Sequence, residues 1–206
     1  MNLEILYAFV LATAALAFAP GPDNIYVLMQ SMVHGVKSGL ATVFGLMSGC
    51  VVHTSLVAFG VSVLIKQSPF LFTGLKVVGA GYLLFLAYKV FKGNAHIQLG
   101  EGHVPKKTYK SLFVQGFFMN VLNPKVSIFF LAFFPGFLFS DSMNSVWQFY
   151  ILGAIFIVVS FIIFAFIAIL AGRISIYLKQ HKNTGLVLKW LQIVVFMGIA
   201  AFLLLK

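Results

Sequence analysis

Long apolar segments constrain the fold of this chain more than any other feature of its sequence. Charges and turn residues separate them into stretches at about 3–33, 39–65, 69–91, 111–139, 146–171 and 185–205. A transmembrane helix needs roughly 20 apolar residues, and every stretch reaches about that length. Since 61% of the residues are hydrophobic and 9% are charged, a water-soluble fold would expose large apolar patches. The sequence predicts an all-α polytopic membrane protein of about six transmembrane helices, with residues 1–206 as a single membrane domain.

Proline interrupts two of these segments. The first contains Pro20-Gly21-Pro22, and the fourth contains Asn123-Pro124. Lipid cannot satisfy a free backbone polar group, so a helix break at depth must face protein or a water-filled cavity. Breaks at corresponding positions of two halves are typical of transporters built from inverted repeats, with the binding site near the middle of the membrane. We predict two inverted three-helix repeats, 1–91 and 111–206, joined by a linker at 92–110.

The distribution of basic residues predicts an orientation. In a six-span arrangement one side is rich in lysine and arginine and the other has mainly Lys66, Lys76 and Lys206. The rich side holds Lys37, Lys89, Lys92, Lys106, Lys107, Lys110, Arg173, Lys179, Lys182 and Lys189. Because cytoplasmic loops carry the excess of basic residues, we expect the linker in the cytoplasm and both termini outside. If segment one or six does not span, one terminus changes sides.

Composition also excludes several classes of function. The formal net charge of +10 is spread over segment ends and loops, which argues against a nucleic-acid partner. Cys50 is the only cysteine, so neither a disulfide nor a CxxC site can form within the chain. His96 and His103 flank Glu101 in the linker, where a solvated loop is a better interpretation than a metal site. With no HExxH or GxSxG motif and only four acidic residues, we expect no enzyme activity, metal or cofactor.

Two ionisable residues lie deep in the apolar segments, where charges are unfavourable and are typical of function. Asp23 follows Pro22, which suits the first turn of a helix, so its carboxylate lies at a positive helix end near free N–H groups. Asn123 and Pro124 are suited to the N-cap and first position of another half-helix. Lys125 would then be opposed by the helix dipole. It needs a negative partner, either Asp23 or a substrate carboxylate.

Two interpretations of this pair are open. In one, Asp23 and Lys125 form a buried ion pair that locks the two halves together. In the other, Asp23 receives the ammonium group of a substrate, or a coupled proton, while Lys125 and free N–H groups hold the substrate's carboxylate. We favour the second interpretation. The helix breaks lower the stability of the fold, and a purely structural role could be filled by packing without this loss.

Further polar residues are candidates for the same site. Asn120 and Asn123 are three residues apart and so near one face of a helix, and Asn24 adjoins Asp23. His53 lies within the second segment, where an imidazole can relay protons; a neutral histidine bonded to a neighbouring helix is an equal alternative. Gly45 and Gly49 form a GxxxG pattern, which indicates close helix packing and permits a homodimer.

These motifs, in order, resemble the lysine exporter family, the LysE/RhtB-type amino-acid efflux translocators. The resemblance covers essentially the whole chain. It rests on Pro20-Gly21-Pro22-Asp23-Asn24, on Gly35, Gly39, Gly45 and Gly49, on Gly79-Ala80-Gly81-Tyr82-Leu83, on Gly116 and Asn120, and on Asn123-Pro124-Lys125 and Phe133-Phe134-Pro135. It implies a multi-pass protein of the bacterial inner membrane that exports amino acids or small derivatives, driven by the proton gradient. Together with the distribution of basic residues, this places both termini in the periplasm.

One position departs from the resemblance. Gly136 stands where we expect a polar residue, commonly Gln, and this puts the substrate's identity in doubt. No second acidic residue lies in the spans to hold a basic side chain, so a neutral or apolar amino acid is the better expectation. The alternatives are an exporter of metal ions or other small solutes from a related six-helix family, or a membrane scaffold that transports nothing.

Overall fold

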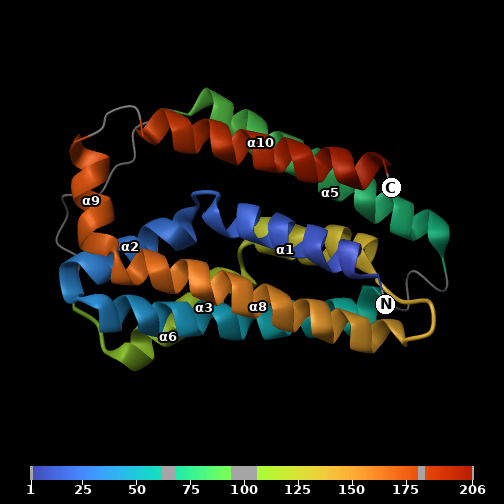
Figure 1. The fold of residues 1–206 in the computed structure, drawn as a ribbon, viewed down its shortest axis with the longest axis horizontal. Helices are drawn as coiled ribbons and strands as arrows, with labels where there is room; N and C mark the ends of the chain where they lie inside the picture. Colours follow the sequence, from blue (N-terminus) through green and yellow to red (C-terminus); the bar gives the residue numbers. More distant parts are fainter. Residues whose placement is uncertain (1, 62–67, 94–105, 181–183, 206) are drawn as a thin grey trace.

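The chain forms an elongated bundle of helices, most of which run along its long axis (Figure 1). The computed structural model describes residues 2–61, 68–93, 106–180 and 184–205. Over these ranges it is helical and contains no β-strand, which confirms the predicted all-α class. Most of the predicted linker, including His96, Glu101 and His103, lies outside the described residues.

The predicted transmembrane segments correspond to four unbroken candidate spans and two bent helix pairs, which make six spans if each bent pair crosses the membrane once. The unbroken spans are α3 (Val36–Leu56) continued by the π-helical turn η1 (Val57–Val61), α5 (Pro69–Lys92), α8 (Ser145–Ile169) and α10 (Thr184–Leu205). The bent spans are α1 (Leu3–Phe18) with α2 (Pro22–His34), and α6 (Tyr109–Val121) with α7 (Pro124–Ile128), η2 (Phe129–Phe133) and η3 (Phe134–Phe137). The fold is therefore that of a polytopic membrane protein, as predicted.

Both bends occur at the predicted proline positions. The axes of α1 and α2 meet at 61°, and those of α6 and the helical segment after it meet at 50°. Pro22 and Pro124 occupy the first turn of the helix that follows each bend, where the missing N–H is no loss. The Asn123 side chain accepts a hydrogen bond from the Lys125 N–H at 3.0 Å, so it acts as the predicted N-cap.

The bundle has two sides, with α1 and the segment after the second bend between them (Figure 1). Helices α5 and α10 pack against each other on one side, while α3, α6 and α8 form the other (Figure 1). Between them α1 packs against the segment after the second bend through edge-to-face rings, such as Phe9 with Phe134 at 4.9 Å. α1 begins and α10 ends at the same end of the bundle (Figure 1), as an even number of crossings requires. The inverted relation of the halves stays a prediction.

A short helix lies across the opposite end of the bundle. α9 (Ala171–Gln180) packs against α2 (Figure 1), in a region that the apolar pattern assigns to a simple connection. Its buried side is formed by Ala171 and Ser175, whereas Ile176 and Tyr177 are exposed. Ten residues span about 15 Å, too short to cross a bilayer. The helix is therefore a connection between spans and is not a span itself.

The glycine pattern of the second segment is used within the chain. A Cβ atom at Gly45 would collide with the Phe113 carbonyl of α6, and one at Gly116 with the Thr42 carbonyl of α3. At Gly49 a Cβ would lie 2.8 Å from the Asn120 side chain. These glycines let the two backbones approach closely. The GxxxG face of α3, which was expected to permit a homodimer, packs against α6. This face therefore gives no support to the predicted dimer.

This close packing predicts a large stability effect. We expect Gly45→Ala to destabilise the protein by about 2 kcal/mol, because the added methyl group meets backbone atoms that cannot rotate away. The thermal midpoint of detergent-solubilised protein, followed by size-exclusion chromatography after heating, measures this effect. Gly81→Ala is the matched control, since the described structure places no atom within 4 Å of a Cβ there. An equal change in the two variants would contradict the prediction.

Candidate functional site

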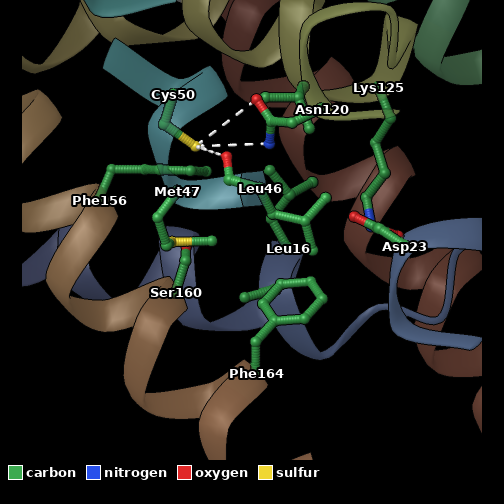
Figure 2. A pocket seen from close by; sticks show the side chains of 12 residues that line it. Leu16, Asp23, Leu46, Met47, Cys50, Asn120, Lys125, Phe156, Ser160 and Phe164 are labelled. Carbon is green, nitrogen blue, oxygen red and sulfur yellow. Dashed lines mark hydrogen bonds between the residues drawn. The ribbon is translucent and has the colours of Figure 1, made fainter. Parts of the chain in front are cut away.

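Six helices line a pocket beside the two bends. Asp23 of α2, Asn120 of α6 and Lys125 of α7 contribute polar groups, as do Cys50 of α3 and Ser160 of α8 (Figure 2). Apolar side chains complete the walls, among them Leu16, Leu46, Met47, Phe156 and Phe164. Three of the predicted site residues therefore share one pocket. They come from both broken spans, which the predicted site requires.

Lys125 is buried and its ammonium is bonded to the first break. The side chain is 7% exposed, and its Nζ donates to the Ala19 carbonyl at 2.9 Å. Ala19 ends α1 and has lost the usual helical partner of its carbonyl because of the break. The negative end of the α1 dipole thus lies beside the lysine. Sequence reasoning named two negative partners for this cation, and the carbonyl of Ala19 is a third that it missed.

Asp23 lies in the first turn of α2 with its carboxylate against the break. Its Oδ1 accepts a hydrogen bond from the Asn24 N–H at 3.1 Å, and the residue is 6% exposed. Gly21 leaves space for it, because a Cβ there would lie 2.5 Å from Oδ1. Figure 2 shows the Lys125 side chain extending toward this carboxylate. A buried negative group and a buried positive group therefore line one pocket, and they can bind the two charged ends of a zwitterion.

Asn120 connects this pocket to α3. Its Nδ2 donates to the Cys50 sulfur at 3.4 Å, and its backbone carbonyl lies 3.2 Å from Nε2 of His53. His53 is buried and its ring centroid is 5.3 Å from that of Phe130. It contacts the backbone of a pocket residue without lining the pocket. The observed bond matches the alternative of a histidine bonded to a neighbouring helix, and a role in proton relay stays a prediction.

The remaining predicted residues stabilise the bends. Asn24 donates through Nδ2 to the Ala17 carbonyl at 2.8 Å, which gives a second orphaned carbonyl of α1 a donor. Asn123 caps α7, as described above. Neither contributes to the lining of the pocket. We therefore assign both asparagines to the geometry of the breaks.

The pocket is narrow in this conformation. The volume open to the centre of a water molecule is about 20 Å³, which is room for one water. An amino acid does not fit without movement of the surrounding helices. The pocket therefore lacks room for a substrate in this conformation.

Two pocket residues were missed by sequence reasoning. Cys50 was considered only for disulfide and metal chemistry, and Ser160 is a single hydroxyl in an otherwise apolar stretch of α8. That isolation was the available signal for Ser160. Gly136, the departure from the resembled family, lies in η3 away from the pocket. A Cβ there would lie 2.9 Å from the Phe202 ring of α10, so a larger polar residue would require this ring to move.

The two broken spans bring an acid and a base into one pocket. This arrangement is typical of polytopic membrane proteins that have a polar site inside the helix bundle. The chain belongs to the LysE type translocator family, whose family model matches residues 14–206. This confirms the resemblance found in the sequence.

Curated relatives match along most of their length. The homoserine/homoserine lactone efflux protein of Salmonella typhimurium is 32% identical over 89% of this chain and 88% of its own. The protein of the same name from Salmonella typhi is 33% identical over the same shares. The uncharacterized membrane protein YrhP of Bacillus subtilis is 29% identical over 87% of this chain and 89% of its own. No solved structure matches the chain.

Proposed function

We propose that this protein exports a small neutral amino acid, or a derivative of one, from the cytoplasm in exchange for protons. The pocket between the two bends is the substrate site. Asp23 binds the ammonium group or the coupled proton, and Lys125 binds the carboxylate. The pocket that joins one buried acid and one buried base from the two broken spans carries this proposal.

Two further observations support the choice of substrate. The two Salmonella relatives are named for efflux of homoserine and its lactone, which are small molecules without a second negative or positive group on the side chain. The described walls of the pocket contain one carboxylate and one ammonium group. A basic side chain would need an additional acid, so the charges favour a neutral substrate.

Orientation and location belong to the same proposal. We place the chain in the inner membrane of a bacterium with both termini in the periplasm. The end of the bundle that contains α9 also receives the basic residues Lys92, Lys110 and Arg173, as a cytoplasmic end does. Export then runs from the α9 end toward the end where α1 begins.

The small volume of the pocket bears on the proposed transport cycle. Because the pocket has room for about one water molecule, we expect substrate to enter after the helices separate toward the cytoplasm and to leave after they separate toward the periplasm. The two bends provide places where the angle between half-helices can change without loss of helical hydrogen bonds. At each bend, side chains already bond to backbone groups: the carbonyls of Ala17 and Ala19 at the first bend and the Lys125 N–H at the second.

A metal-ion exporter has less support. The described residues contain no cluster of three or more histidine, cysteine, aspartate or glutamate side chains that could hold a metal ion. Metal-resistance assays discriminate the two proposals.

Amino-acid accumulation during a dipeptide load tests the function directly. Bacteria that take up and hydrolyse dipeptides accumulate the released amino acids, so an exporter should lower the intracellular level and raise the level in the medium. We expect this difference for small neutral amino acids and not for lysine. A protonophore should abolish it if protons drive the export. Equal amino-acid levels with and without the protein would refute the proposal.

A further inference from the structure

Ser160 is a buried hydroxyl that the transport mechanism above does not use. It is the only side chain with a hydrogen-bonding group between Ile151 and Ile169 of α8. Its exposed fraction is 1%, and its Oγ has no hydrogen-bond partner among the described residues. The side chain lines the pocket, toward the side away from Asp23 and Lys125 in Figure 2.

Thr13 and Ser31 are also buried hydroxyls without a partner among the described residues, but neither of them lines the pocket. Several other helical hydroxyls bond to the carbonyl four residues earlier. They include Ser38, Thr42, Ser48, Thr54, Ser55 and Ser127. This back-bonding is the usual solution for serine and threonine in apolar helices. Ser160 does not adopt it. A buried hydroxyl without a partner is unfavourable. Because Ser160, unlike Thr13 and Ser31, lines the pocket, a molecule bound there can supply the missing hydrogen bond.

The pocket therefore has polar groups at two places, with apolar walls between them. Asp23 and Lys125 form one polar end, and Ser160 is apart from them, with Leu16 and Leu46 in between (Figure 2). A zwitterion bound at the first end would direct its side chain along the apolar walls. A polar group on that side chain would then lie toward the part of the pocket that Ser160 lines.

We infer that Ser160 is a specificity-determining residue that hydrogen-bonds a hydroxyl group on the side chain of the exported amino acid. This inference rests on the proposed function and adds the substrate class: short, neutral and hydroxylated. One water molecule satisfies Ser160 when the site is empty, and the substrate hydroxyl displaces it. An isostere that replaces the hydroxyl with a methyl group leaves Ser160 without a partner and is exported more slowly.

A matched substrate pair tests this role. L-Homoserine and L-norvaline have side chains of equal length, and the second has a methyl group in place of the hydroxyl. We expect full-length protein in proteoliposomes to transport homoserine faster than norvaline. Ser160→Ala should slow homoserine about fivefold to tenfold, the size of one hydrogen bond, and leave norvaline unchanged or faster. Ser160→Cys, with a weaker donor of similar size, should give an intermediate ratio.

The control is Ser48→Ala, which removes a back-bonded hydroxyl of α3 that does not line the pocket and should leave both rates unchanged. If Ser160→Ala slows both substrates equally, the residue has only a structural role and the inference is overturned, although transport itself stands. If the wild-type protein transports neither amino acid, the proposed function fails as well. The ratio of the two rates therefore separates the two failures.

Discussion

Asp23→Asn is expected to abolish amino-acid efflux while the protein still inserts in the membrane. The amide is nearly isosteric with the carboxylate, and its oxygen can still accept the hydrogen bond from the Asn24 N–H. The change removes the negative charge from a site where the residue is 6% exposed, so neither an ammonium group nor a proton is bound there. If the substrate forms a buried charged contact with Asp23, removing this charge should lower the efflux rate at least about thirtyfold. Efflux of isotope-labelled homoserine from preloaded vesicles measures it.

Asp141→Asn is the matched control for this experiment. Asp141 is an exposed acid in the loop before α8, so the same change of charge should leave efflux unaltered. Membrane-inserted protein is quantified in parallel for both variants. Undiminished efflux in Asp23→Asn would remove this carboxylate from the mechanism.

Lys125→Met is expected to reduce both export and stability. The substitution keeps the length of the side chain but leaves the Ala19 carbonyl without its donor and the Asp23 carboxylate without a nearby cation. A buried acceptor without a partner costs about 2 kcal/mol, which corresponds to a thermal midpoint lower by about 5 °C. Thermal midpoints in detergent and initial efflux rates measure the two effects. Lys110→Met, at an exposed position of α6, is the control and should change neither.

The double variant Asp23→Asn/Lys125→Met separates the two interpretations of this pair. If the residues only lock the halves together, removing both charges should restore much of the stability and of the efflux that the single variants lose. If they bind substrate, the double variant should regain stability and remain inactive. Recovered efflux in the double variant would therefore support the structural interpretation and contradict the substrate site proposed here.

The spans and bends were predictable from sequence because they depend on local chemistry. The lengths of the apolar stretches were enough to define six segments. Because proline lacks an N–H and suits the first turn of a helix, Pro22 and Pro124 indicated where both half-helices begin. Helix α9 could not be found in this way. It is too short for a hydropathy signal, and its amphipathic pattern covers ten residues.

The site was predictable only in part, because pocket geometry depends on tertiary contacts. Buried charge identified Asp23 and Lys125 through the high free energy of ions in lipid. The Ala19 carbonyl could not be named as a partner, since a backbone acceptor has no signal of its own in a sequence. Asn120 and Asn123 are three residues apart, yet the bend between them places one in the pocket and the other in a cap.

Space for one water molecule is too little for a continuous file of water across the bilayer. Protons move readily along such files, and a protein with an open one would discharge the membrane potential. A resting copy of this exporter should therefore conduct no protons through the pocket that holds its acid and its base. A cell could then keep many copies in its membrane and lose energy only when substrate is carried out.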